Sequence, residues 1–132
     1  MAANTTPIFT IVPHVGMVRI STANTGRDGS GTQNTVLTAS TNGTRIDRIM
    51  IRATATTTAG QVRFFIYDGT NYRFWQEIAV TAATPSGTVQ AFTAAIYSPD
   101  QNPLLVLPST WQLTCAPHNN ESFDVIAHGG DF

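Results

Sequence analysis

The sequence predicts an all-β fold, a jelly-roll-like antiparallel β-sandwich of about eight or nine short strands. Two strand-like runs between residues 60 and 80 flank the tetrapeptide Asp68-Gly69-Thr70-Asn71, and an Asp-Gly step suits the tight turn of a β-hairpin. Clusters of Gly, Pro, Asn, Asp and Ser also recur about every ten residues, while no stretch keeps a helical period. An immunoglobulin-like sandwich is the alternative.

The strands are expected between these turn-forming clusters. They are placed at about residues 15–23, 35–39, 47–55, 61–67, 72–80, 89–97, 104–107, 110–116 and 122–128. Residues 1–14 include the short hydrophobic run PIFTIV, which stops at Pro13. We therefore expect an extended N-terminal arm over residues 1–14 and one sandwich domain over residues 15–132.

Composition narrows the class of protein. With 132 residues the chain is long enough for one domain with its own core, and only 11% of its residues are charged. The formal net charge of −1 argues against a nucleic-acid binder that neutralises phosphates. No hydrophobic run approaches the roughly 18 residues of a membrane span, so a soluble protein made in a cytoplasm is expected.

All seven basic residues are arginine. Arginine is the cation favoured at desolvated protein contacts, because its planar group pairs with carboxylates and stacks on rings. This usage favours a protein that works through interfaces, although compositional drift in a small protein would give the same pattern.

Alternation in the strands indicates which side chains face out. Val62, Phe64 and Ile66 are expected inward, and so are Ile49, Ile51, Ala53 and Ala55. If the strands are neighbours, the opposite positions form one outward face of the kind found at interfaces. That predicted partner-binding face comprises Arg48, Met50, Arg52, Arg63, Phe65, Tyr67, Arg73 and Trp75. The alternative is that a loop or the arm covers the face, or that a bulge shifts the alternation.

The C-terminal strands alternate more regularly. Trp111, Leu113, Cys115, Phe123, Val125 and Ala127 are expected inward, which makes Cys115 a buried hydrophobic residue rather than a nucleophile. Since Cys115 is the only cysteine, the monomer holds no disulfide.

No catalytic, cofactor-binding or metal-binding site is predicted, and we expect no enzyme activity. His118, His128, Asp124 and Asp131 lie close in sequence, but their spacing matches no known set of metal ligands. Asp68 and Asp100 occupy turns, where aspartate commonly caps the backbone.

Several segments resemble small β-rich virion proteins of tailed bacteriophages. They are STANTGRDGSGT, NGTRIDRIMIRATATTTAG, FIYDGTNYR, LVLP and the ending HGGDF, within residues 16 to 132. The resemblance implies a structural protein of the particle, and the closest analogy is a capsid decoration or cement protein. Such proteins are usually jelly rolls or β-sandwiches that trimerise on the outer shell and grip neighbouring capsid subunits with an N-terminal arm.

Two mechanisms are expected from these observations. In the first, Ile8, Phe9, Ile11 and Val12 add to the major capsid protein or another virion subunit as an extended strand, and the outward arginine and aromatic face joins copies of the chain. In the second, the chain is a tail-associated receptor- or carbohydrate-binding module. Exposed Trp75, Tyr67 or Tyr72 would then stack on a sugar ring.

Overall fold

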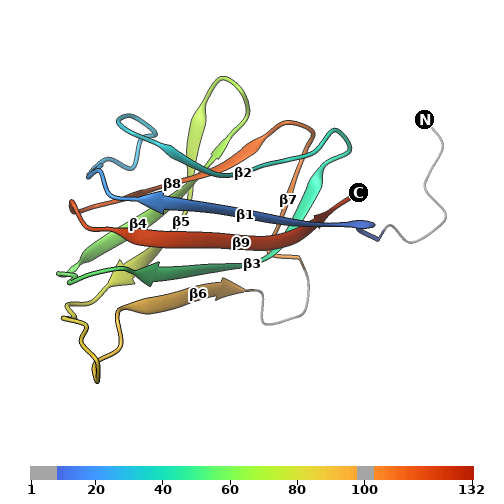
Figure 1. Cartoon of the computed structure of the whole chain (residues 1–132). Coiled ribbons are helices and arrows are strands. Elements are labelled where there is room, and N and C mark those ends of the chain that lie inside the picture. The colour runs from blue at the N-terminus through green and yellow to red at the C-terminus, as the bar shows by residue number, and fades with distance from the viewer. Residues whose placement is uncertain (1–8, 98–102) are drawn as a thin grey trace, which may run out of the picture.

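The computed structural model describes residues 9–97 and 103–132, which form two antiparallel β-sheets packed face to face (Figure 1). Sheet A contains β1 (Val12–Ile20), β9 (Phe123–Asp131), β3 (Thr44–Ala53), β6 (Thr93–Tyr97) and β7 (Leu105–Leu107). Sheet B contains β2 (Asn34–Thr38), β8 (Gln112–Pro117), β4 (Gly60–Tyr67) and β5 (Tyr72–Val80). The predicted all-β sandwich is confirmed.

The order of the strands is that of a jelly roll. Sheet A runs β1-β9-β3-β6, with the short β7 also pairing with β3, and sheet B runs β2-β8-β4-β5. Consecutive strands therefore cross between sheets at β1 to β2 and again at β2 to β3, as in the two Greek keys of a jelly roll. An immunoglobulin-like sandwich keeps its first two strands in one sheet, so that alternative is wrong.

Each of the nine predicted segments contains a strand, but some boundaries move. β1 begins at Val12 rather than residue 15, because Val12 pairs with Asp131 and the Ile11 amide donates a 2.8 Å hydrogen bond to the Asp131 carbonyl. Residues 12–14, which the sequence places in the arm, thus belong to sheet A. Pro13 is tolerated in β1 because this strand lies at the edge of the sheet.

The core lies between the sheets and follows the predicted alternation. Ile49, Ile51, Val62 and Phe64 are fully buried, as are the inward residues of β8 and β9, including Leu113, Cys115, Val125 and Ala127. The prediction for Ala55 is wrong: β3 ends at Ala53, and Ala55 is exposed. Complete burial also raises the pKa of the Cys115 thiol, because a thiolate is poorly solvated there.

β9 passes β3 at unusually close range near a β-bulge. The register between the two strands shifts between Ile46 and Arg48, and the bulge brings the backbone of β3 against Gly129. A Cβ on Gly129 would lie 1.8 Å from the carbonyl oxygen of Arg45. Glycine is therefore required here by space rather than by backbone torsion.

Replacing Gly129 with alanine should destabilise the fold by about 1–3 kcal/mol, because the two strands must move apart to admit a methyl group. Urea unfolding followed by circular dichroism measures this change. Gly87→Ala is the matched control, since a Cβ on Gly87 meets no atom within 4 Å. Equal stability of the two variants would contradict the close approach.

Candidate interaction surface

The outer face of sheet A presents three rows of side chains across four strands. Because directly paired residues point to the same side of a sheet, the rows follow from the register. From β1 to β6 they are Arg19, Asp124, Arg52 and Thr93; Met17, Ile126, Met50 and Ala95; and Val15, His128, Arg48 and Tyr97. We call these twelve positions the sheet A face.

The central row is hydrophobic. Met17 is 76% exposed, and Ile126 and Met50 are partly exposed. Two hollows lie on either side of Ile126: one of about 400 Å³ borders Met17, and one of about 200 Å³ borders Met50. The row is therefore a hydrophobic surface with two hollows, into which small side chains of a partner would fit.

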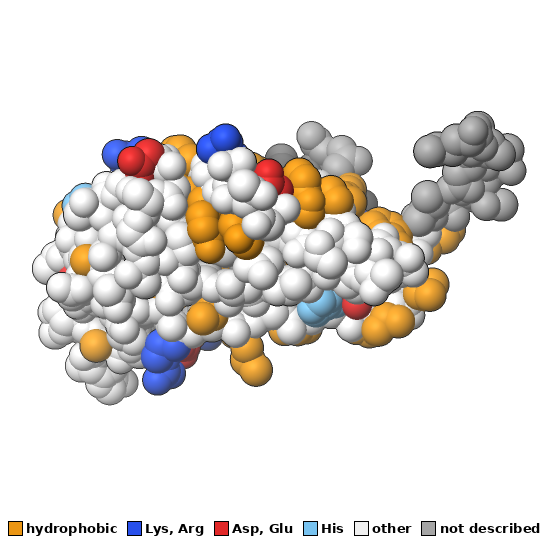
Figure 2. Space-filling model, turned by 90° about the horizontal axis from the view of Figure 1, so that it is seen from above, with side chains coloured by type: hydrophobic (Ala, Val, Ile, Leu, Met, Phe, Trp, Pro, Cys, Tyr) orange, Lys and Arg blue, Asp and Glu red, His pale blue; other side chains and the backbone are white. Residues whose placement is uncertain are grey.

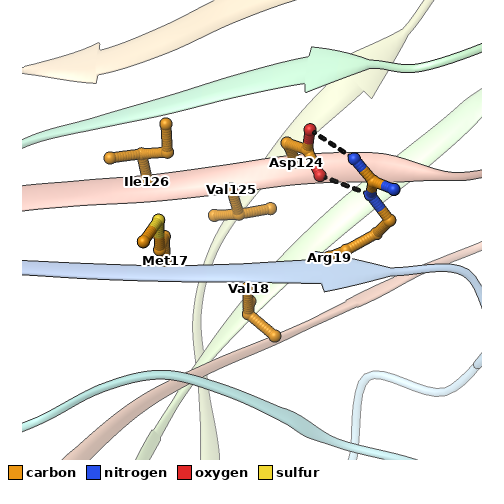
Figure 3. Close-up of a pocket in the computed structure, with 6 residues that line it drawn as sticks. All are labelled: Met17, Val18, Arg19, Asp124, Val125 and Ile126. Carbon is orange, nitrogen blue, oxygen red and sulfur yellow. Dashed lines mark hydrogen bonds and ion pairs between the residues drawn. The ribbon is translucent and has the colours of Figure 1, made fainter.

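The rows on either side carry the charge. Arg19 reaches from β1 to Asp124 on β9, with its Nε 2.7 Å and its Nη2 3.1 Å from the two carboxylate oxygens (Figure 3). These hydrogen bonds and the charge of Arg19 hold the pKa of Asp124 below its usual range. Arg48 and Arg52 are exposed and make no ion pair with any described residue. The sheet A face thus has more positive than negative charge.

The predicted partner-binding face is not one surface. Arg48, Met50 and Arg52 do lie together on the sheet A face, but the remaining five residues are on β4 and β5 in the other sheet. The prediction depended on these strands being neighbours, and the jelly-roll order separates them. The single continuous face is therefore wrong.

Arg63 and Phe65 point outward from sheet B, as their alternation predicts, yet only 2% of Arg63 and none of Phe65 is exposed. The loop between β1 and β2 (residues 21–33) covers this side of the sheet. Its Asn24 accepts a 3.3 Å hydrogen bond at the backbone oxygen from Arg63, and its Gln33 accepts a 3.2 Å bond from the Thr114 hydroxyl of β8. The expectation that both residues are exposed is wrong, and the covering loop is the alternative that the sequence left open.

Arg63 has its remaining partners on β5 and after β8. Its Nε lies 3.3 Å from a Glu77 oxygen that also accepts a 3.0 Å bond from Arg27, and its Nη1 lies 3.1 Å from Nδ1 of His118. Since an arginine only donates, His118 accepts this bond through an unprotonated Nδ1. Arg63 therefore ties the β1–β2 loop to sheet B.

Tyr67, Arg73 and Trp75 occupy three different settings. The Tyr67 ring stacks on Tyr72 at a centroid distance of 4.2 Å, and Arg73 is exposed. A bulge in β5 makes Trp75 the extra residue opposite the Phe64–Phe65 step, and its side chain packs against the core. The expectation that Trp75 faces outward is wrong, for the reason that a bulge shifts the alternation.

The predicted arm residues are partly described. Ile8 lies outside the described residues, whereas Phe9, Ile11 and Val12 are 72%, 79% and 51% exposed. Figure 2 shows hydrophobic side chains gathered at the end of the molecule where the described chain begins. Val12 is held in β1 by Asp131, so of these three residues only Phe9 and Ile11 precede the first strand.

The sequence did not identify Met17, Arg19, Ile126 or Tyr97 as part of a surface. Alternation in β1 places Val15, Met17 and Arg19 on one side, which is a usable signal. What brings them beside Met50 and Arg52 is the insertion of β9 between β1 and β3, and this long-range pairing has no local signature.

A third hollow, of about 580 Å³, lies where the β2–β3 turn meets β7 and the C-terminus. It is lined mainly by Pro103, Val106, Pro108 and Phe132, with Arg45 at its side. Nearby, Asp131 accepts 2.6 Å bonds from Thr44 and His14. Burial disfavours the charge of Asp131, but these hydrogen bonds and the charge of His14 outweigh it and keep the pKa of Asp131 low.

Within residues 9–97 and 103–132, no group of three or more His, Cys, Asp or Glu side chains is arranged to hold a metal ion. The same part of the chain contains no helix with the length and hydrophobicity to cross a membrane.

No protein-family model and no curated protein sequence matches the chain. Among solved structures, the chain is similar to a chain of the "Cyanophage Pam1 capsid asymmetric unit" with a TM-score of 0.43 and 16% identity, over 99% of this chain and 94% of that one. At this level of similarity the two chains are not shown to share a fold or a function.

Replacing Arg63 with methionine should lower the free energy of unfolding by about 1–3 kcal/mol, because the Asn24 carbonyl loses a buried donor. Arg73→Met is the matched control at an exposed position of β5, and it should change the free energy of unfolding by less than about 0.5 kcal/mol. Thermal and urea unfolding of both variants measure the difference. A neutral Arg63→Met would show that the β1–β2 loop does not depend on this contact.

Stability should also fall in acid. Because the pKa values of Asp124 and Asp131 are lowered in the folded chain, their stabilising effect is present above the unfolded value of about 4 and is lost as pH falls through the folded values. The melting temperature of Asp131→Asn should therefore change less than that of the native chain between about pH 5 and pH 2. If the melting temperatures of the two proteins fell equally over this pH range, Asp131 would not contribute to the loss of stability in acid.

Proposed function

We propose that this chain is a structural protein of a tailed-bacteriophage particle, a decoration or cement protein that binds the head surface through protein–protein contacts. The observation that carries the proposal is the sheet A face, where Met, Ile, Arg and Tyr side chains are exposed or partly exposed on a regular sheet. Aromatic, Met and Arg side chains are enriched at the cores of protein interfaces. The sequence segments that resemble phage virion proteins support the same role.

The N-terminal segment supports attachment to a neighbour. Phe9 and Ile11 are largely exposed and precede an edge strand, the arrangement from which an extended segment adds to another subunit. Burial of such side chains contributes about 25 cal/mol per Å² of hydrophobic area. Repetition over a symmetric shell multiplies modest contacts into firm attachment.

A trimer is the oligomer that we include in this proposal. A ring of three copies uses two different surfaces of each chain, in contrast to a two-fold dimer, in which the same surface meets itself. In such a ring the copies would meet through surfaces other than the sheet A face, which would be left to bind the head.

The carbohydrate-binding alternative is not favoured. Trp75 packs against the core, and one face of the Tyr67 ring is occupied by Tyr72. A sugar-stacking platform requires an open aromatic face, which these residues do not offer together.

Removal of residues 1–9 should leave the melting temperature close to that of the full chain, because β1 and its hydrogen bonds to β9 are retained. The truncated chain should bind empty heads of the encoding phage at least about tenfold more weakly in co-sedimentation, as expected when an exposed hydrophobic anchor is lost. Full binding by a folded truncated chain would show that the arm is not the attachment.

Light scattering on a sizing column over a range of concentrations tests the trimer, and a persistent monomer in solution and on heads would exclude it.

A further inference from the structure

We propose that the sheet A face binds a partner other than a second copy of this chain, namely a protein surface that presents a hydrophobic side chain flanked by carboxylates. The proposal deepens the proposed function, on which it rests, by stating the chemistry of the virion subunit that is bound.

The charge on the face favours negatively charged partners. Arg48 and Arg52 flank Met50 on β3, are both exposed, and make no ion pair with any described residue. Arg19 is already engaged in two hydrogen bonds by Asp124. Two guanidinium groups on either side of a hydrophobic centre therefore remain to be paired on binding.

The described carboxylates of this chain already have internal partners. Arg45 holds Asp47, Arg27 and Arg63 hold Glu77, and the others accept hydrogen bonds from Ser, Thr, Asn, His or Arg groups of the same chain. The seven are Asp28, Asp47, Asp68, Glu77, Glu121, Asp124 and Asp131. If one of these seven described carboxylates of a second copy paired with Arg48 or Arg52, the pairing would compete with a contact that it already makes within its own chain.

Contact between two sheet A faces is also unfavourable. Each face carries three arginines and one aspartate, so a two-fold dimer through this surface would bring like charges together. Charge complementarity thus selects against self-pairing and favours an acidic partner.

The spacing defines the partner further. Arg48 and Arg52 are four residues apart on a strand, which places them about 13 Å apart, with Met50 midway and on the same side. An extended segment with acidic residues four positions apart and a hydrophobic residue between them has the same spacing. Its hydrophobic side chain would enter the hollow between Met50 and Ile126 while its carboxylates meet the two arginines.

The test is a nuclear magnetic resonance titration of the full chain with a soluble peptide containing Glu-Thr-Leu-Thr-Glu. We expect shifts at the methyl groups of Met50 and Ile126, and at least about tenfold weaker binding by Arg48→Gln/Arg52→Gln, since two charge-assisted contacts are lost. Thr70→Glu/Arg73→Gln lowers the net charge by two, as Arg48→Gln/Arg52→Gln does, but on the exposed β4–β5 hairpin, and should bind the peptide within about twofold of the native chain.

Three results would overturn the proposal. The first is the absence of shifts with this peptide, or equal shifts with a Lys-Thr-Leu-Thr-Lys peptide. The second is a stronger response of the same methyl groups to duplex DNA, which would make phosphates the ligand. The third is a shift that depends on protein concentration alone, which would make a second copy the occupant.

Head binding separates this inference from the proposed function. If the native chain binds heads and Arg48→Gln/Arg52→Gln binds them equally well, the sheet A face is not the contact although the virion role stands. If the native chain binds no head, the virion role fails, whereas the peptide titration still decides the chemistry of the face.

Discussion

The cover over sheet B depends on the buried Arg63 of β4, which shares Glu77 with Arg27 of the β1–β2 loop. Arg63 is buried and always charged, so it needs carboxylate and carbonyl partners where water is excluded. Those partners come from the loop and from β5. The same contacts that satisfy the arginine therefore fix a long loop over one sheet.

This cover makes the two sides of the sandwich unequal. Part of the outer side of sheet B is buried under the loop, including Arg63, Phe65 and the Thr114 hydroxyl that bonds to Gln33. The outer side of sheet A carries a hydrophobic row between charged rows. One sheet is thus partly covered by the chain itself, whereas the other leaves its outer side chains accessible.

Local sequence was sufficient for the strands but not for their neighbours. The alternation of Val62, Phe64 and Ile66 and the Asp68 turn predicted β4 and β5 correctly, because both signals lie within a few residues. The burial of Arg63 and Phe65 was not predictable, since it is caused by a loop much earlier in the chain. Trp75 shows a second limit of prediction from local sequence. A bulge reverses the alternation there, and no residue type at that position indicates the bulge.

The candidate surface shows the same division. Arg48, Met50 and Arg52 were identified from β3 alone, whereas Met17 and Ile126 join them only because β9 lies between β1 and β3. Composition pointed to interface residues, but only the order of the strands shows which of them share a surface. The single continuous face failed because it assumed that the consecutive strands β3 and β4 are adjacent.

The pairing of the first strand with the last has a practical consequence for attaching cargo to this chain. Val12 lies opposite Asp131, and Thr10 packs beside Gly130 (Figure 1). A fluorescent protein or peptide fused after Phe132 would emerge close to Thr10 and Val12, and so close to the exposed Ile11. An epitope inserted at Gly69, where an added Cβ would meet no atom within 4 Å, would avoid that proximity and would suit display.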